Sequence, residues 1–143
     1  MTVKQLSVFV ENRPGKLAEA LEALSGANID LRALSLADTS DFGILRAIVD
    51  KPDYALEVLS EAGFLVKTNE VLAIIVGDKP GGLAAVVRIL SEAGIDIEYT
   101  YAFVAHSSDN AYVILRVGNN EAAVDVLTKS GTTLLTANEL YSM

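Results

Sequence analysis

The fold of this chain is decided by residues 14–31, PGKLAEALEALSGANIDL, because nearly the same stretch recurs at residues 80–97 as PGGLAAVVRILSEAGIDI. A chain of 143 residues that contains two copies of one unit leaves about 70 residues for each copy, and a module of that size has only a small hydrophobic core. We therefore predict two modules, residues 1–69 and 70–143, that bury surface against each other or against a second chain.

Each copy has the pattern of a strand, a helix, two strands, a helix and a strand. In the first copy, a strand rich in Val, Leu and Phe stops at Pro14 and Gly15, and leucines at helical spacing follow. Pro52 suits the first position of the second helix. The expected elements are strand 4–10, helix 16–27, strands 31–37 and 44–50, helix 54–62 and strand 64–68, then strand 71–76, helix 83–93, strands 95–104 and 111–117, helix 121–130 and strand 133–141.

The order βαββαβ, present twice, predicts an α+β fold of two ferredoxin-like modules, each an antiparallel four-stranded sheet with both helices on one face. In the strand 95–104 the apolar residues alternate with polar ones, which predicts one shared face for Ile95, Ile97, Tyr99, Tyr101 and Phe103. The face of each sheet without helices needs a cover. Two modules could join edge to edge or stack through these open faces, and both arrangements remove exposed strand edges.

Composition and charge exclude several classes of function. Half of the residues are apolar (51%), which favours a folded core, and the net charge of −8 opposes binding to nucleic acid or to anionic lipid. The sequence has no cysteine, and its first residues lack the pattern of a signal peptide. No apolar run reaches the length of a membrane span. We expect a cytoplasmic protein that binds neither nucleic acid nor membranes.

Catalytic and metal-binding patterns are weak. His106 is the only histidine and is followed by Ser107, Ser108 and Asp109. Adjacent residues of one loop cannot place a base between a nucleophile and an orienting carboxylate, so we interpret this segment as a solvated hairpin loop. One histidine without cysteine gives no metal-ligand cluster. We expect no enzyme activity, no catalytic residue, no metal and no cofactor.

The informative segments are the two loops between strand and helix, residues 11–17 and 77–83. Each places a glycine at the start of a helix, where free N–H groups form a seat for a carboxylate. A plain N-cap by Asn12 or by Asp78 explains the same residues. Asn28 also has two interpretations, because it is either a ligand-binding side chain or the left-handed residue that ends a helix, as Gly94 is in the other copy.

Basic residues near these segments have alternative interpretations too. Arg13 and Lys16 are either partners for a carboxylate or solvated residues at a helix start. Arg46 and Arg116 recur at matching strand positions, and they mark either a sheet face buried in a dimer or an ordinary exposed strand.

The motif Asn-Arg-Pro-Gly-x-Leu-Ala at residues 12–18, followed by Ala-Asn-Ile-Asp at the end of the helix, resembles an ACT domain, and the resemblance recurs in the second copy, so it covers essentially the whole chain. ACT domains are ferredoxin-like regulatory modules that bind amino acids, usually at interfaces between two such domains. Asn12 and Asn28 match the ligand-holding asparagines of the serine-sensing ACT domain of phosphoglycerate dehydrogenase. That family member has a histidine where this chain has Val10, and the second copy has Asp78 and Gly94 in place of the two asparagines.

The resemblance implies a stand-alone regulatory protein that senses a small L-amino acid at an interface between ACT modules and acts on a separate partner. The bare sheet faces favour a homodimer. The alternatives are a structural or interaction module without a ligand, or the regulatory subunit of an amino-acid biosynthetic enzyme. The two loops should differ, with the ligand carboxylate at the first loop and an ammonium or polar group at Asp78. The expected ligand-binding residues are Asn12, Arg13, Pro14, Gly15, Lys16, Leu17, Asn28, Ile29, Asp78, Lys79, Pro80, Gly81, Gly82, Leu83, Gly94 and Ile95.

Overall fold

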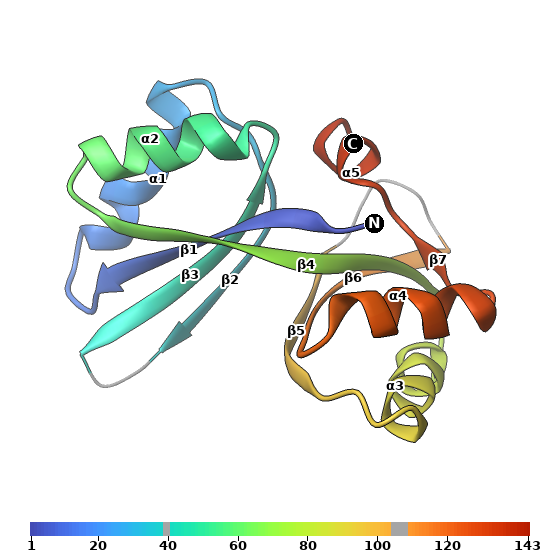
Figure 1. The fold of residues 1–143 in the computed structure, drawn as a ribbon. Coiled ribbons are helices and arrows are strands. Elements are labelled where there is room, and N and C mark those ends of the chain that lie inside the picture. Colours follow the sequence, from blue (N-terminus) through green and yellow to red (C-terminus); the bar gives the residue numbers. More distant parts are fainter. Residues whose placement is uncertain (39–40, 104–108) are drawn as a thin grey trace. The chain divides into compact units, whose positions relative to one another are not determined.

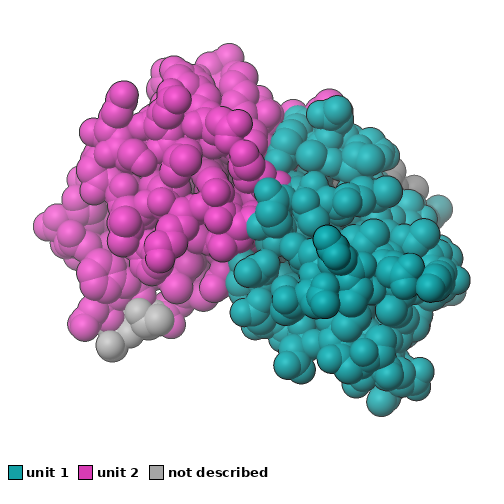
Figure 2. Space-filling model, viewed as in Figure 1, with its two compact units in different colours: residues 1–3, 70–141, 143 teal, residues 4–69, 142 magenta. Residues whose placement is uncertain are grey.

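The computed structural model describes residues 1–38, 41–103 and 109–143, so the histidine of the expected hairpin loop lies outside the described residues. The chain divides into two compact units (Figure 2). We call residues 4–69 together with Ser142 the N-terminal unit, and residues 1–3, 70–141 and 143 the C-terminal unit. Each unit is described by itself.

The N-terminal unit is a four-stranded sheet with two helices on one face (Figure 1). Its strand order is β2-β3-β1-β4, and β3 is antiparallel to both of its neighbours. The core lies between the helices and the sheet, where Leu6 and Val8 of β1 form one buried cluster with Leu24 and Leu59 of the helices. The elements are β1 (Val3–Glu11), α1 (Lys16–Gly26), β2 (Leu31–Asp38), β3 (Phe42–Val49), α2 (Pro52–Glu61) and the first residues of β4 (Leu65–Gly77).

The C-terminal unit repeats this arrangement with the strand order β7-β4-β6-β5. Its core again lies between helices and sheet, with Leu72 and Leu115 of the strands packed with Leu90 and Leu127 of the helices. The elements are the remaining residues of β4, then α3 (Gly82–Glu92), β5 (Ile97–Phe103), β6 (Asn110–Val117), α4 (Asn120–Lys129), β7 (Thr133–Leu134) and α5 (Ala137–Tyr141). The α+β, ferredoxin-like architecture of both modules is therefore confirmed, as is Pro52 at the start of α2.

The end of the chain differs from the prediction of a strand over residues 133–141. Only Thr133 and Leu134 pair with β4, and α5 follows. The reason is a capping box, because the Thr136 N–H donates to Glu139 Oε1 (3.1 Å) and the Glu139 N–H donates to Thr136 Oγ1 (3.2 Å). These two bonds begin a helix where apolar content alone suggested a strand.

The predicted shared face of β5 is right for Tyr99, Tyr101 and Phe103 and wrong for Ile97. The register of β5 against β6 shifts between Ile97 and Tyr99, so that Ile97 lies opposite the core residue Val117 whereas Tyr99 lies opposite Arg116. An extra residue in a strand reverses the phase of its side chains. Ile97 therefore packs against the core, and Tyr99 and the alternate residues after it point to the opposite face. The Phe103 ring stacks on Tyr112 with 5.3 Å between centroids.

The two expected strands 64–68 and 71–76 form one strand, β4, because no Pro or Gly interrupts the sequence between them. None of the helices in the described part of the chain is long and apolar enough to cross a membrane.

Candidate functional site

The first loop joins β1 to α1 through Gly15, whose φ of 91° lies in the left-handed region. No side chain caps α1, so the interpretation of Asn12 as an N-cap is wrong. The Asn12 amide donates instead to Asp38 Oδ1 (3.3 Å), and its backbone N–H donates to the Asp41 carbonyl (3.1 Å). The first turn of α1 therefore presents backbone N–H groups that no side chain satisfies, which is the requirement for a carboxylate seat.

The second loop, between β4 and α3, also turns at a left-handed glycine, but its backbone is packed more closely. Gly81 is left-handed with φ of 89°, and no side chain caps α3, so Asp78 is not an N-cap either. A Cβ atom added to Gly82 would lie 2.3 Å from the Gly77 carbonyl oxygen. Only glycine fits at this position, whereas the first copy accommodates Lys16 at the matching place.

The first helices of the two units, α1 and α3, also end in the same way. Asn28 has φ of 57° and Gly94 has φ of 73°, so both are the left-handed residue that ends a helix. The N–H of Ile29 then returns to the Leu24 carbonyl (3.0 Å). Helix termination accounts for the residue type at position 28, and a ligand contact of the Asn28 side chain stays a prediction. Its carbonyl accepts a bond from Lys51 Nζ (2.7 Å).

The structure brings three of the expected residues of the first loop, Asn12, Arg13 and Leu17, to a cavity of about 260 Å³. An ion pair and a hydrogen bond border it: Arg13 Nε lies 2.9 Å from Glu11 Oε2, and the Asn12 amide donates to Asp38 Oδ1. The cavity is lined by Val10, Glu11, Asn12, Arg13, Leu17, Leu36, Asp38 and Gly43.

Asp38 and Leu36 of β2 were missed by the sequence analysis. They lie about two dozen residues from the loop, and only the pairing of β2 with β3 places them beside it. Asn28 and Ile29 do not line this cavity. Within the N-terminal unit, this cavity therefore includes the loop and not the segment that follows α1.

In the C-terminal unit the expected residues Gly94 and Ile95 line a cavity of about 290 Å³ at the end of α3. The expected residues of the second loop do not line this cavity. These residues are Asp78, Lys79, Pro80, Gly81, Gly82 and Leu83. The cavity described for the C-terminal unit thus lies at the helix end.

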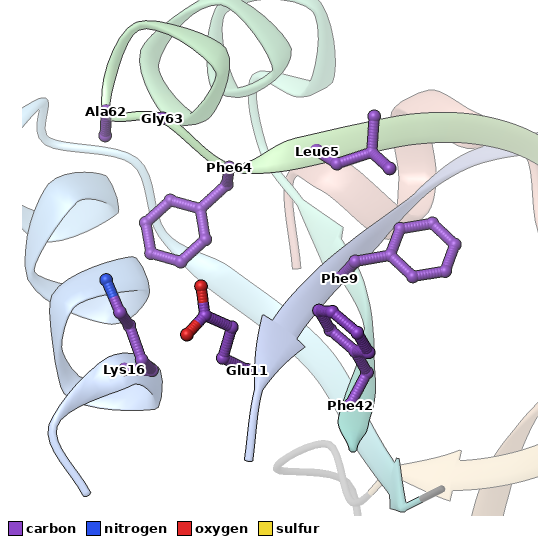
Figure 3. Close-up of a pocket in the computed structure, with 8 residues that line it drawn as sticks. All are labelled: Phe9, Glu11, Lys16, Phe42, Ala62, Gly63, Phe64 and Leu65. Atoms are coloured by element: carbon purple, nitrogen blue, oxygen red, sulfur yellow. The ribbon is translucent and has the colours of Figure 1, made fainter. Parts of the chain in front are cut away.

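A larger cavity of about 460 Å³ lies elsewhere in the N-terminal unit and was not anticipated (Figure 3). Lys16 lines it and does not line the loop cavity. The remaining lining residues are Phe9, Glu11, Phe42, Ala62, Gly63, Phe64 and Leu65. The signal for this cavity in the sequence was three phenylalanines that lie far apart.

Charged and amide groups converge with backbone N–H groups, and among the described residues no group of three or more His, Cys, Asp and Glu side chains could hold a metal ion.

Comparisons with known proteins agree with this fold. A family model described as an ACT domain pair matches residues 1–143. A search of curated proteins finds no significant match. Among solved structures, a Bacteroides thetaiotaomicron protein is 41% identical with a TM-score of 0.94, covering 100% of this chain and 98% of that one.

Two further structures share the fold at lower identity. The ligand-free regulatory subunit of aspartate kinase from Thermus thermophilus is 21% identical with a TM-score of 0.64, covering 89% of this chain and 91% of that one. The regulatory subunit of aspartate kinase from Thermus flavus is 20% identical with a TM-score of 0.61, covering 90% of this chain and 92% of that one.

Proposed function

Because the chain belongs to the family of ACT domain pairs, we propose that it is a regulatory protein that binds a small L-amino acid and transmits the binding event to a separate partner, such as an amino-acid biosynthetic enzyme. The single observation that supports the proposal is the first loop, where an uncapped helix start borders a cavity that also contains both signs of charge.

The cavity of the first loop suits a zwitterion of modest size. The ligand carboxylate would accept bonds from the backbone N–H groups at the start of α1, an interaction that contributes about 0.3–1 kcal/mol from the helix dipole alone. Arg13 borders the same space and reinforces the positive end. The Asp38 carboxylate lies on the β2 side of the cavity and would take the ammonium group, with Asn12 holding it in place.

A second copy of the chain would complete this site. β2 is the last strand in the order of the N-terminal unit, so its outer edge is unpaired within that unit. It carries Leu34 and Leu36, which are 49% and 48% exposed, and Leu36 also lines the cavity. A homodimer that covers these leucines would shield the bound amino acid from water, and binding would in turn stabilise the dimer.

The test is a thermal-shift screen against the twenty proteinogenic amino acids, followed by calorimetry on matched variants. We expect one small amino acid to raise the melting temperature. Asn12→Ala should weaken its binding by about tenfold or more, whereas Asp78→Ala, at the matching position of the second loop, should have a different and smaller effect. Equal and small effects of both substitutions would refute the asymmetry. The absence of a shift with any amino acid would favour a ligand-free interaction module.

A further inference from the structure

The cavity at the end of β1 differs from the loop cavity in chemistry as well as in position. Three aromatic rings, from Phe9, Phe42 and Phe64, contribute its apolar surface. Glu11 and Lys16 supply one carboxylate and one ammonium. Its volume of about 460 Å³ falls within the range of small-molecule sites, which is roughly 300–1,000 Å³.

The backbone explains why these side chains meet. Glu11 pairs with Phe42, and Phe9 pairs with the residue two positions further along β3, so Phe9, Glu11 and Phe42 share one face of the sheet. Phe64 follows the left-handed Gly63 at the end of α2, and its N–H donates to the Leu59 carbonyl (3.0 Å). Figure 3 shows the Lys16 ammonium and the Glu11 carboxylate directed into the space beside the Phe64 ring.

The matching positions of the C-terminal unit carry other residues. In the C-terminal unit Gly77 pairs with Asn110 as Glu11 pairs with Phe42, and Thr132 bonds to Leu127 as Phe64 bonds to Leu59. The same architecture is thus built there without aromatic or charged groups. Its residues at the five positions are Ile75, Gly77, Gly82, Asn110 and Thr132.

Exposed aromatic surface in the N-terminal unit therefore needs another explanation. Phe42 is 46% exposed and Leu65 is 62% exposed, although water-exposed apolar surface is unfavourable. The charged groups are held by bonds that a ligand can displace, since Glu11 pairs with Arg13 (2.9 Å) and Lys16 with Glu19 (3.0 Å), and these partners are exposed.

We propose that this cavity, which shares Glu11 with the loop cavity, is a second binding site for a zwitterion with a large aromatic side chain. The ligand ammonium pairs with Glu11 and its carboxylate pairs with Lys16, while its ring packs between Phe64 and the pair of Phe9 and Phe42. The inference does not depend on the proposed function, because neither Asn12 nor Asp38 lines this cavity.

The test uses L-tryptophan as the probe, because the protein has no tryptophan of its own and the ligand fluorescence, excited at the red edge where tyrosine does not absorb, is read without protein background. We expect saturable binding, with amide shifts in the NMR spectrum of the full chain concentrated at residues 62–65. Phenylacetate and phenethylamine, which each lack one charge, should bind at least about tenfold more weakly. Binding of either compound as tight as that of L-tryptophan would overturn the zwitterion assignment.

Matched variants test whether L-tryptophan binds in this cavity. Phe42→Asn and Phe64→Thr install the residues that the C-terminal unit has at these positions, and each should weaken binding by about tenfold or more. Lys16→Gln should do the same. Tyr54→Ala, which removes an aromatic side chain that is 47% exposed and lies outside the cavity, is the control and should leave binding unchanged.

Asn12→Ala separates this inference from the proposed function, because it should impair the loop cavity and leave L-tryptophan binding intact. Phe64 also packs against the core, so Phe64→Thr carries a risk of unfolding. If Phe64→Thr unfolds, the proposal is tested by Phe42→Asn, which changes a more exposed residue, and by the NMR amide shifts of the unmodified chain. Absent binding, or binding unaffected by Phe42→Asn and Lys16→Gln, would overturn the proposal.

Discussion

Gly82 illustrates how one residue makes the two loops different. A side chain at this position would have to enter space occupied by the Gly77 carbonyl oxygen, 2.3 Å from a Cβ atom, and a backbone group cannot move aside easily. We predict that Gly82→Ala lowers the free energy of unfolding by about 1–3 kcal/mol. Urea denaturation followed by circular dichroism measures the change.

The matched control is Gly26→Ala at the end of α1, because a Cβ atom at Gly26 would meet nothing within 4 Å. Alanine in a helix is favoured over glycine, so this variant should be as stable as the original protein or slightly more stable. A Gly82→Ala variant with unchanged stability would show that the loop relaxes, and the difference between the two copies would lose its steric basis.

For single residues, the sequence predicted the backbone conformation where the residue type depends on local backbone geometry alone. Asn28 and Gly94 are left-handed, as their places after the helices predict. The capping role of Asn12 was wrong because a glycine takes the cap position and the Asn12 side chain reaches Asp38 on β2. That contact depends on strand pairing, which residue type and local spacing do not specify.

At the level of elements, α5 depends on a bond pattern that also affects protonation. Hydrogen bonds from the Thr136 hydroxyl and from its backbone N–H hold the pKa of Glu139 below its usual value. A lowered folded-state pKa means that this group stabilises the fold above the pKa of the unfolded chain, and that the contribution is lost as the pH falls through the folded-state pKa.

We therefore predict that α5 loosens at acidic pH, below the range in which an ordinary glutamate titrates. Titration of the Glu139 side-chain carboxyl carbon by NMR, together with the amide signals of α5, measures both events. Thr136→Ala removes the hydroxyl donor and should return the Glu139 pKa toward its usual value. A Glu139 pKa that stays the same in this variant would contradict the assigned cause.

The elements were largely predictable because apolar spacing and breakers are local signals. The sequence Thr136-x-x-Glu139 was a recognisable sign of a helix start, and it was overlooked in favour of apolar content. The register shift between Ile97 and Tyr99 was not predictable in the same way, since both residues suit either face of a strand. The cavity at the end of β1 combines three distant segments, and no local pattern reveals it.

At the level of the whole molecule, the proposed homodimer leads to a prediction about β2. Among the described residues, β2 is an edge strand of its unit that carries two exposed leucines, whereas β5, at the edge of the C-terminal unit, has none of the large apolar residues that are strongly exposed. An apolar edge strand favours pairing with another chain. We expect the unmodified protein to sediment as a dimer.

Leu34→Lys should shift this equilibrium toward the monomer, because a charge on an edge strand opposes strand pairing and because the apolar contact is lost. Leu34 does not line the loop cavity, so any accompanying loss of amino-acid affinity would arise from the missing second copy. Tyr54→Lys, which replaces a similarly exposed apolar residue on α2, is the control and should stay dimeric. Sedimentation velocity with and without the amino acid measures both effects. A Leu34→Lys variant that remains dimeric and binds normally would exclude this edge, and a site that one chain completes by itself would then explain the binding better.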